Sequence, residues 1–151
     1  MYMIHEKLYT SKDLAKIDFS NYIYNLVDYL KDCYPLVSDT VEISVNTQNV
    51  SLGLNKAISC GMIINELVSN AYKYAFNPGQ KGFIKISLNL DTNDLYRLVI
   101  EDNGNGFPND IDFKKTESLG MVIVNSFTGQ LDGTIDLIRT KGTKFVIKFP
   151  S

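Results

Sequence analysis

The sequence predicts an α+β fold, a two-layer sandwich in which helices cover one face of a mixed β-sheet. Residues 63–75 carry a broad apolar stripe at helical spacing, and residues 119–131 form another apolar helical stretch. Four β-rich runs occur in two pairs, which are 83–90 with 95–100 and 134–139 with 143–149. Two strand pairs separated by a helix are typical of a sheet that carries its helices on one side.

The composition indicates one globular domain, because the 151 residues are 44% hydrophobic and 21% charged. A net charge of -2 without basic runs argues against a nucleic-acid partner, and we expect no direct membrane contact. One histidine and two cysteines are too few for a His/Cys zinc site. We expect Cys33 and Cys60 to be two buried thiols of a cytoplasmic protein, with a disulfide as the less favoured alternative.

The first expected helix follows a short N-terminal segment, residues 1–17. After Asp18, apolar residues recur at intervals of three and four, which predicts a helix that Asp18 or Ser20 caps and that ends before Pro35. The apolar positions of this helix are Tyr22, Leu26, Tyr29, Leu30 and Cys33. Residues 41–46 then alternate between apolar and polar, as in a half-buried strand.

The central helix, which we expect to end near residues 77–79, has a polar edge beside its apolar stripe. The stripe comprises Cys60, Ile63, Ile64, Leu67, Val68, Ala71 and Ala75. Glu66, Asn70 and Lys73 fall at i, i+4 and i+7 along one edge of it. A carboxylate, a neutral oxygen ligand and a cation on adjacent turns suit the binding of Mg²⁺ and a triphosphate. An ordinary amphipathic helix with a solvated polar edge is the alternative.

A glycine-rich loop, D-N-G-N-G, follows the strand at 95–100. Its Gly104 and Gly106 allow backbone conformations that other residues avoid and let a flat ligand lie against the main chain. Its Asp102 can accept a hydrogen bond from an exocyclic amino group such as that of adenine. A tight turn would use the same residues.

The helix at 119–131 begins with Ser118-Leu119-Gly120-Met121, so its free backbone N–H groups can bind a phosphate. A capping serine followed by a packing glycine is the alternative. The expected apolar face of this helix comprises Leu119, Val122, Ile123 and Phe127. Further on, Gly142 and Thr143 form a turn before an edge strand, or place a hydroxyl near the site.

Taken together and in this order, N-E-L-V-S-N-A-Y-K-Y, D-N-G-N-G, S-L-G-M and K-G-T resemble the N, G1, G2 and terminal G-T motifs of the Bergerat-fold ATPases. That superfamily includes gyrase, the heat-shock chaperone, histidine kinases and mismatch-repair ATPases. Three features favour the sensor histidine kinases: the N-A-Y-K-Y-A-F run, the 13-residue gap (107–119) before Gly120, and the N-terminal I-H-E-K-L-Y stretch. The resemblance spans nearly the whole chain.

The resemblance implies a role for each matching residue. Glu66, Asn70 and Lys73 would be catalytic, with Asn70 as the Mg²⁺ ligand and Glu66 either polarising the acceptor imidazole or contacting the metal through water. Asp102 would contact the adenine amino group, and Thr143 would lie near the base-binding end. The residues that would bind ATP are Asn70, Lys73, Tyr74, Asp102, Gly104, Gly106, Leu119, Gly120 and Thr143.

The resemblance also implies the catalytic domain of a two-component sensor histidine kinase. The γ-phosphoryl group of ATP would pass to a histidine on a dimerisation segment absent from this chain, and then to a response regulator. Residues 1–17 would follow that segment, residues 18–151 would be the ATPase domain, and residues 105–118 would be a lid. We expect no self-phosphorylation, at His5 or elsewhere, and a parent protein that is soluble or membrane-anchored. The alternatives are an anti-sigma-type serine kinase, an ATP-hydrolysing relative, or a nucleotide-binding module without transfer activity.

Overall fold

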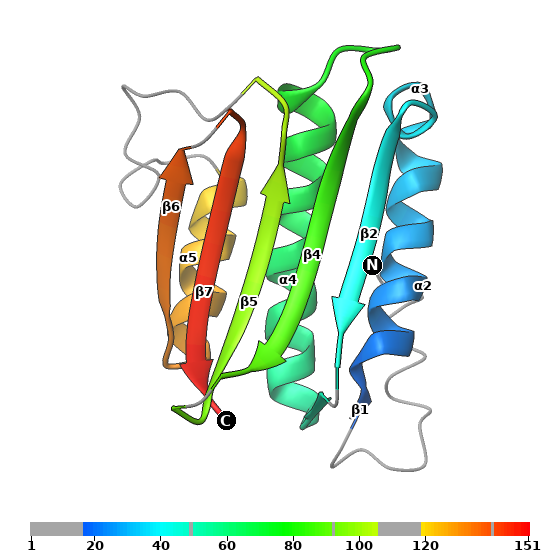
Figure 1. Cartoon of the computed structure of the whole chain (residues 1–151). Coiled ribbons are helices and arrows are strands. Elements are labelled where there is room, and N and C mark those ends of the chain that lie inside the picture. Colours follow the sequence, from blue (N-terminus) through cyan, green and yellow to red (C-terminus); the bar gives the residue numbers. More distant parts are fainter. Residues whose placement is uncertain (1–16, 49, 92, 106–118, 140) are drawn as a thin grey trace.

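A five-stranded mixed sheet forms one layer of the molecule in this computed structural model (Figure 1). The structure describes residues 17–48, 50–91, 93–105, 119–139 and 141–151. The strand order is β2-β4-β5-β7-β6; β2 runs parallel to β4, and the other neighbours are antiparallel. The strands are β2 (Val41–Thr47), β4 (Gly82–Leu90), β5 (Leu95–Asp102), β6 (Thr134–Arg139) and β7 (Thr143–Pro150).

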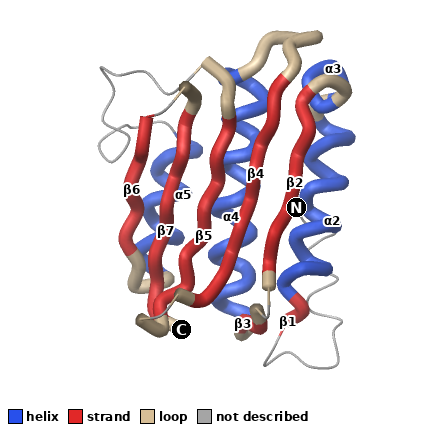
Figure 2. The backbone as a smooth tube through the Cα atoms, in the orientation of Figure 1, coloured by secondary structure: helices blue, strands red, loops and turns tan. Residues whose placement is uncertain are grey.

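Three helices pack on one face of this sheet, as Figures 1 and 2 show. They are α2 (Phe19–Cys33), α4 (Leu54–Asn70) and α5 (Leu119–Gln130). A short α3 (Pro35–Ser38) follows α2, and β1 (Ile17–Asp18) pairs with β3 (Ser51–Leu52) in a small separate sheet. The predicted α+β two-layer sandwich is therefore confirmed. None of the helices in the described part of the chain combines the length and the apolar character that crossing a bilayer requires.

The first helix, α2, starts where the sequence predicts. Asp18 is its N-cap, and its carboxylate accepts a hydrogen bond from the Asn21 N–H at 3.3 Å. The other candidate cap, Ser20, instead forms a hydrogen bond with the Thr47 hydroxyl of β2. The buried face comprises Phe19, Tyr22, Ile23, Leu26, Val27 and Leu30.

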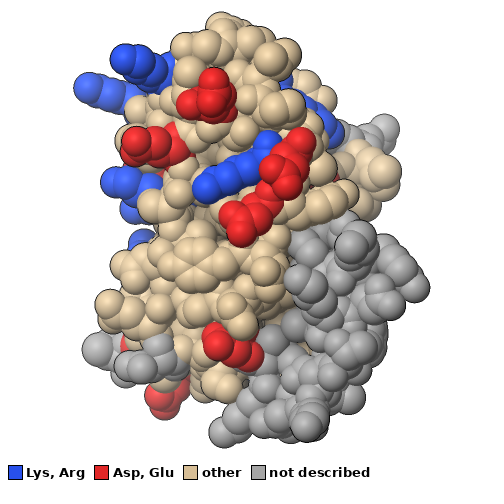
Figure 3. Space-filling view, turned by 90° about the vertical axis from the view of Figure 1, so that its right-hand side faces the viewer, with Lys and Arg blue, Asp and Glu red and all other residues tan. Residues whose placement is uncertain are grey.

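Two residues expected on that face, Tyr29 and Cys33, are exposed. Tyr29 lies on the flank of the buried face, and Cys33 is the last residue of the helix, where the chain turns into α3. The expectation of two buried thiols is therefore wrong for Cys33 and right for Cys60, which is fully buried. Figure 3 shows the side of the molecule that carries α2, where acidic and basic side chains lie close to one another.

The second helix, α4, buries its whole predicted stripe, since each of the seven residues is at most 8% exposed. Gly61 lets α2 approach α4 closely, because a Cβ at this position would overlap the Tyr22 hydroxyl. The helix continues into a π-helical turn, η1 (Ala71–Ala75), and the chain is extended again at Phe76. The predicted end near residues 77–79 is thus two to four residues late.

The third helix, α5, buries a face that only partly matches the expected one, because Phe127 packs partly buried against the core and Ile123 is half-buried. Its buried residues are Met121, Val124 and Thr128, whereas Leu119 and Val122 are exposed. Its first turns are apolar nearly all round, so periodicity could not identify the side that faces α4.

The sequence predicts the last strand, β7, at an edge of the sheet, but it lies between β5 and β6. The edge strands of the five-stranded sheet are β2 and β6. Four apolar side chains of β7 are buried, namely Phe145, Val146, Ile147 and Phe149, as expected for an internal strand.

Candidate functional site

Two polar side chains of α4 converge on the first turn of α5. A Cβ added to Gly120 would lie 3.1 Å from Glu66 Oε2, 3.5 Å from Asn70 Nδ2 and 3.8 Å from Asn70 Oδ1. Glycine therefore leaves open the space that these two side chains face. Carboxylate and amide oxygens are the ligands that Mg²⁺ prefers, and it takes few of them from the protein because phosphates and waters complete its shell. The local chemistry fits such an ion.

Asp102 occupies the last position of β5 and is only 9% exposed. Its Oδ1 accepts a hydrogen bond from the Gly104 N–H at 2.9 Å, and its carboxylate also accepts one from the Thr143 N–H of β7. Burial raises the pKa of this carboxyl, the two N–H groups lower it, nearby Glu101 raises it, and the net direction is upward. Two donors leave the carboxylate with spare acceptor positions, so it can bind a further N–H group.

The loop after Asp102 is held against the end of the central helix. The Asn105 N–H donates to the Ala75 carbonyl oxygen at 2.8 Å. A Cβ at Gly104 would overlap that same oxygen and lie 2.7 Å from Ala75 Cβ. On the other side, a Cβ at Gly142 would overlap the Asp102 carbonyl oxygen. Glycine at 104 and 142 thus lets three segments meet around Asp102.

The π-turn η1 changes the direction of the side chains that follow Asn70. Lys73 and Tyr74 are exposed, and Tyr74 reaches 74% exposure, whereas Tyr72 is buried against Tyr34 with a ring-centroid distance of 5.5 Å. The Tyr72 hydroxyl has no hydrogen-bond partner among the described residues. A π-turn takes more residues per turn than an α-helix, so the 100° spacing no longer applies at Lys73. The A-Y-K-Y-A sequence gives no local sign of it.

Comparison with known families decides the assignment. A family model described as "Histidine kinase-, DNA gyrase B-, and HSP90-like ATPase" matches residues 55–151, which is more than half of the chain. The chain belongs to this ATPase family. A second model, described as "Histidine kinase", matches residues 1–34. Together the two matches identify the chain as the catalytic ATPase domain of a histidine kinase, which confirms the resemblance seen in its motifs.

Several relatives of this ATPase domain are themselves histidine kinases. The chain is 29% identical over 136 residues to the sensor histidine kinase PdtaS of Mycobacterium tuberculosis, covering 83% of this chain and 27% of that protein. It is 24% identical over 99 residues to blue-light-activated histidine kinase 2 of Erythrobacter litoralis, covering 66% of this chain and 29% of that protein. The chain therefore spans less than a third of the length of these curated relatives.

Solved structures show the same fold. The histidine kinase domain of the blue-light-activated histidine kinase EL346 from Erythrobacter litoralis superposes with a TM-score of 0.86 at 20% identity, covering 97% of this chain and 74% of that chain. A mycobacterial sensor histidine kinase, MprB, superposes with a TM-score of 0.71 at 19% identity, covering 89% of this chain and 97% of that chain.

The structure of this ATPase domain brings together most of the predicted residues, in two groups. Glu66, Asn70 and Gly120 form one group between α4 and α5. Asp102, Gly104 and Thr143 form the other at the end of β5, where the following loop is hydrogen-bonded to the Ala75 carbonyl of η1. Lys73, Tyr74 and Leu119 are exposed beside these groups. Gly106 and nearly all of the expected lid lie outside the described residues.

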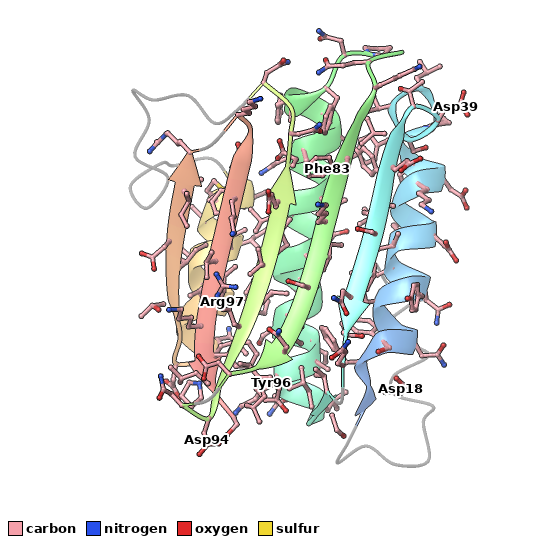
Figure 4. The ribbon with its side chains drawn as sticks, viewed as in Figure 1. Asp18, Asp39, Phe83, Asp94, Tyr96 and Arg97 are labelled. Atoms are coloured by element: carbon pink, nitrogen blue, oxygen red, sulfur yellow. The ribbon has the colours of Figure 1, made fainter. Side chains whose placement is uncertain are left out.

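Two clefts elsewhere are lined by other residues. One, of about 540 Å³, lies between the start of α4 and Tyr96, and Figure 4 shows Tyr96 far from Phe83, which marks the Asp102 end of the sheet. The other, of about 700 Å³, lies along the start of β2 beside Lys31 and Lys81. The sequence places Ala75 in the apolar stripe and Asn103 in the glycine-rich loop but assigns neither a role in the site, because their contacts join segments that are distant in the chain.

Proposed function

We propose that this domain binds Mg·ATP and transfers its γ-phosphoryl group to a histidine on a phosphoacceptor segment of the parent protein. The convergence of Glu66 and Asn70 on the open space at Gly120 is the observation that carries the proposal. Phosphoryl transfer depends on positioning and charge neutralisation more than on covalent help from the protein, so a few well-placed polar groups are enough.

The base end of the nucleotide would bind at Asp102. The Gly104 and Thr143 N–H groups hold this carboxylate in place, so it can accept a hydrogen bond from the adenine amino group without reorganising. Lys73 and Tyr74, exposed on η1, would contact phosphate or ribose, and the backbone at Leu119 and Gly120 would face the phosphates at the start of α5.

The phosphate end would bind between α4 and α5. Asn70 would supply its amide oxygen to Mg²⁺, which neutralises charge on the phosphates when bound. Glu66 would orient the acceptor imidazole by accepting its N–H, or reach the metal through a water molecule. Downstream, the phosphorylated histidine would pass its phosphoryl group to a response regulator in the cytoplasm, where ATP is available.

The metal role of Asn70 is tested by Asn70→Ala, with Asn55→Ala as a matched control in the first turn of the same helix. We expect Mg²⁺ to strengthen ATP binding in the wild-type chain and in Asn55→Ala, and to do so much less in Asn70→Ala, as measured by calorimetry. Both variants should fold, because Asn55 is exposed and Asn70 is outside the buried stripe. An unchanged Mg²⁺ effect in folded Asn70→Ala would contradict the assignment.

The transfer reaction is tested by mixing the domain and radiolabelled Mg·ATP with the phosphoacceptor segment of the parent protein. We expect acid-labile label on that segment and essentially none on this chain, with or without His5→Gln. Acid-stable label would indicate a serine kinase, release of free phosphate alone would indicate an ATPase, and nucleotide binding without either would indicate a module that works by partner contact.

A further inference from the structure

We infer that Asn103 is a positioning residue that sets the adenine-reading geometry of Asp102, an assignment that rests on the proposed function of this site. Asn103 directly follows Asp102 and joins the end of β5 to the start of β4. Its hydrogen bonds that define the turn go to Phe83 of β4, whereas Glu66 and Asn70 face Gly120, so we expect its effect on nucleotide binding to act through its neighbour Asp102.

The hydrogen bonding of Asn103 replaces one bond of the strand ladder. The Asn103 N–H donates to the Phe83 carbonyl oxygen at 3.4 Å, as a further residue of the antiparallel β4–β5 pair would. The reciprocal bond in such a pair would run from the Phe83 N–H to the Asn103 main-chain carbonyl. Here the Phe83 N–H donates instead to the side-chain Oδ1 of Asn103, at 2.7 Å.

Because the side-chain oxygen of Asn103 accepts this bond, its main-chain carbonyl does not have to stay in the sheet. The chain can then leave the strand immediately after Asp102, and the Gly104 N–H returns to the Asp102 carboxylate at 2.9 Å. The amide of Asn103 is confined at this point, since a Cβ at Gly82 would lie 2.8 Å from its Oδ1 and a Cβ at Gly142 would lie 2.8 Å from its Cα.

The bond to Phe83 serves position more than stability. Asn103 is exposed and its bond to Phe83 lies at the surface, so water could satisfy the Phe83 N–H if the side chain were removed. Water cannot, however, tie residue 103 to β4. Without this tie the turn that aims the Asp102 carboxylate becomes one of several conformations, and the bound geometry must be selected from them.

The test compares Asn103→Ala with Thr40→Val, a control that removes another side-chain bond at the same end of the sheet, from Thr40 Oγ1 to the Gln80 carbonyl at 2.7 Å. The readout is the ratio of ADP to IDP affinity by calorimetry, because the two nucleotides carry the same phosphates and IDP lacks the amino group. We expect the ratio to fall about three- to tenfold in Asn103→Ala, the factor that one hydrogen bond represents, and to stay unchanged in Thr40→Val.

Two further variants separate positioning from general structural damage. Asn103→Asp keeps the Oδ1 acceptor and should keep the ADP:IDP ratio, since its added charge repels both diphosphates alike. In an Asp102→Ala background, Asn103→Ala should have no further effect on the ratio, because the two residues act as one unit. If Asn103→Ala does not fold, Asn103→Ser, with its shorter acceptor, should lower the ratio instead.

The possible failures are distinguishable. A wild-type chain that does not bind ADP, or does not prefer it to IDP, would overturn the proposed function and this inference with it. A wild-type chain that prefers ADP, loses that preference in Asp102→Ala and keeps it in folded Asn103→Ala would overturn the positioning role alone. Equal weakening of ADP and IDP in Asn103→Ala would also overturn it, because a merely structural role predicts that result.

Discussion

Replacement of Gly104 by alanine should damage both the stability of the domain and its nucleotide site. The added methyl group would overlap the Ala75 carbonyl oxygen and lie 2.7 Å from Ala75 Cβ and 2.9 Å from its carbonyl carbon. Two of these three atoms belong to the backbone of η1, so no flexible side chain can move aside. The loop must therefore shift away from η1, which breaks the 2.8 Å bond from the Asn105 N–H to Ala75.

The size of the effect follows from three contributions. Overpacking costs about 1–3 kcal/mol, and losing the hydrogen bond costs about 0.5–1.5 kcal/mol. Alanine also restricts the unfolded chain, which offsets about 0.4–1 kcal/mol. The net loss is about 0.5–4 kcal/mol of unfolding free energy, and each kcal/mol lowers the melting midpoint of a domain of this size by roughly 3 °C. Because the Gly104 N–H also holds Asp102, we expect ADP binding to weaken about tenfold.

Urea unfolding and ADP calorimetry test this reasoning when Gly129→Ala is run beside Gly104→Ala. Gly129 is an exposed residue of α5, and a Cβ there meets nothing within 4 Å, so alanine should leave stability unchanged or raise it by up to about 1 kcal/mol. A Gly104→Ala protein with the wild-type unfolding midpoint and ADP affinity would refute the claim that the loop cannot move without consequence.

Two further predictions follow from burial. The folded pKa of Asp102 is raised above its ordinary value of 3.8, so the folded state holds this proton to a higher pH than the unfolded state. As pH rises from the unfolded pKa of Asp102 through its folded pKa, the stability of the wild-type chain relative to Asp102→Asn should therefore fall. As pH drops through the folded pKa, the carboxylate gains a proton and loses an acceptor site, so ADP affinity should fall. An ADP affinity that does not depend on pH would contradict this. Cys33 should react rapidly with a thiol reagent in the native protein, whereas Cys60, buried and with its pKa raised, should react only on unfolding, and equal rates for both would show that the burial is misassigned.

Local pattern was enough to predict the elements whose burial follows from their own periodicity. The stripe of α4, the alternation of β2 and the cap at Asp18 are of this kind, because each depends on residues within a few positions of one another. The polar edge of α4 was predicted for the same reason, and the structure brings Glu66 and Asn70 next to Gly120.

The errors arise where a distant segment decides the outcome. Which face of α5 is buried depends on how Gly120 approaches α4. The internal position of β7 depends on β6 pairing along its outer side. The π-turn at 71–75 leaves no mark in composition, although it determines that Tyr72 is buried and Lys73 is not. The tie from Asn103 to Phe83 joins residues twenty positions apart, so no local motif could reveal it.

The packing of α2 bears on how this kinase module can be engineered. The ATPase family match begins at residue 55, yet α2 and β2 contribute to the same hydrophobic core as α4, α2 through Tyr22 against Gly61 and β2 through Val41. The Ser20–Thr47 hydrogen bond joins α2 to β2. A chimera joined at residue 55 would leave one flank of α4 and one edge of β4 without their covering elements. Fusion points for transplanting this module onto other sensors should therefore keep α2 and β2 together with α4 and the sheet, and the borders of a sequence family are a poor guide to where such a protein can be cut.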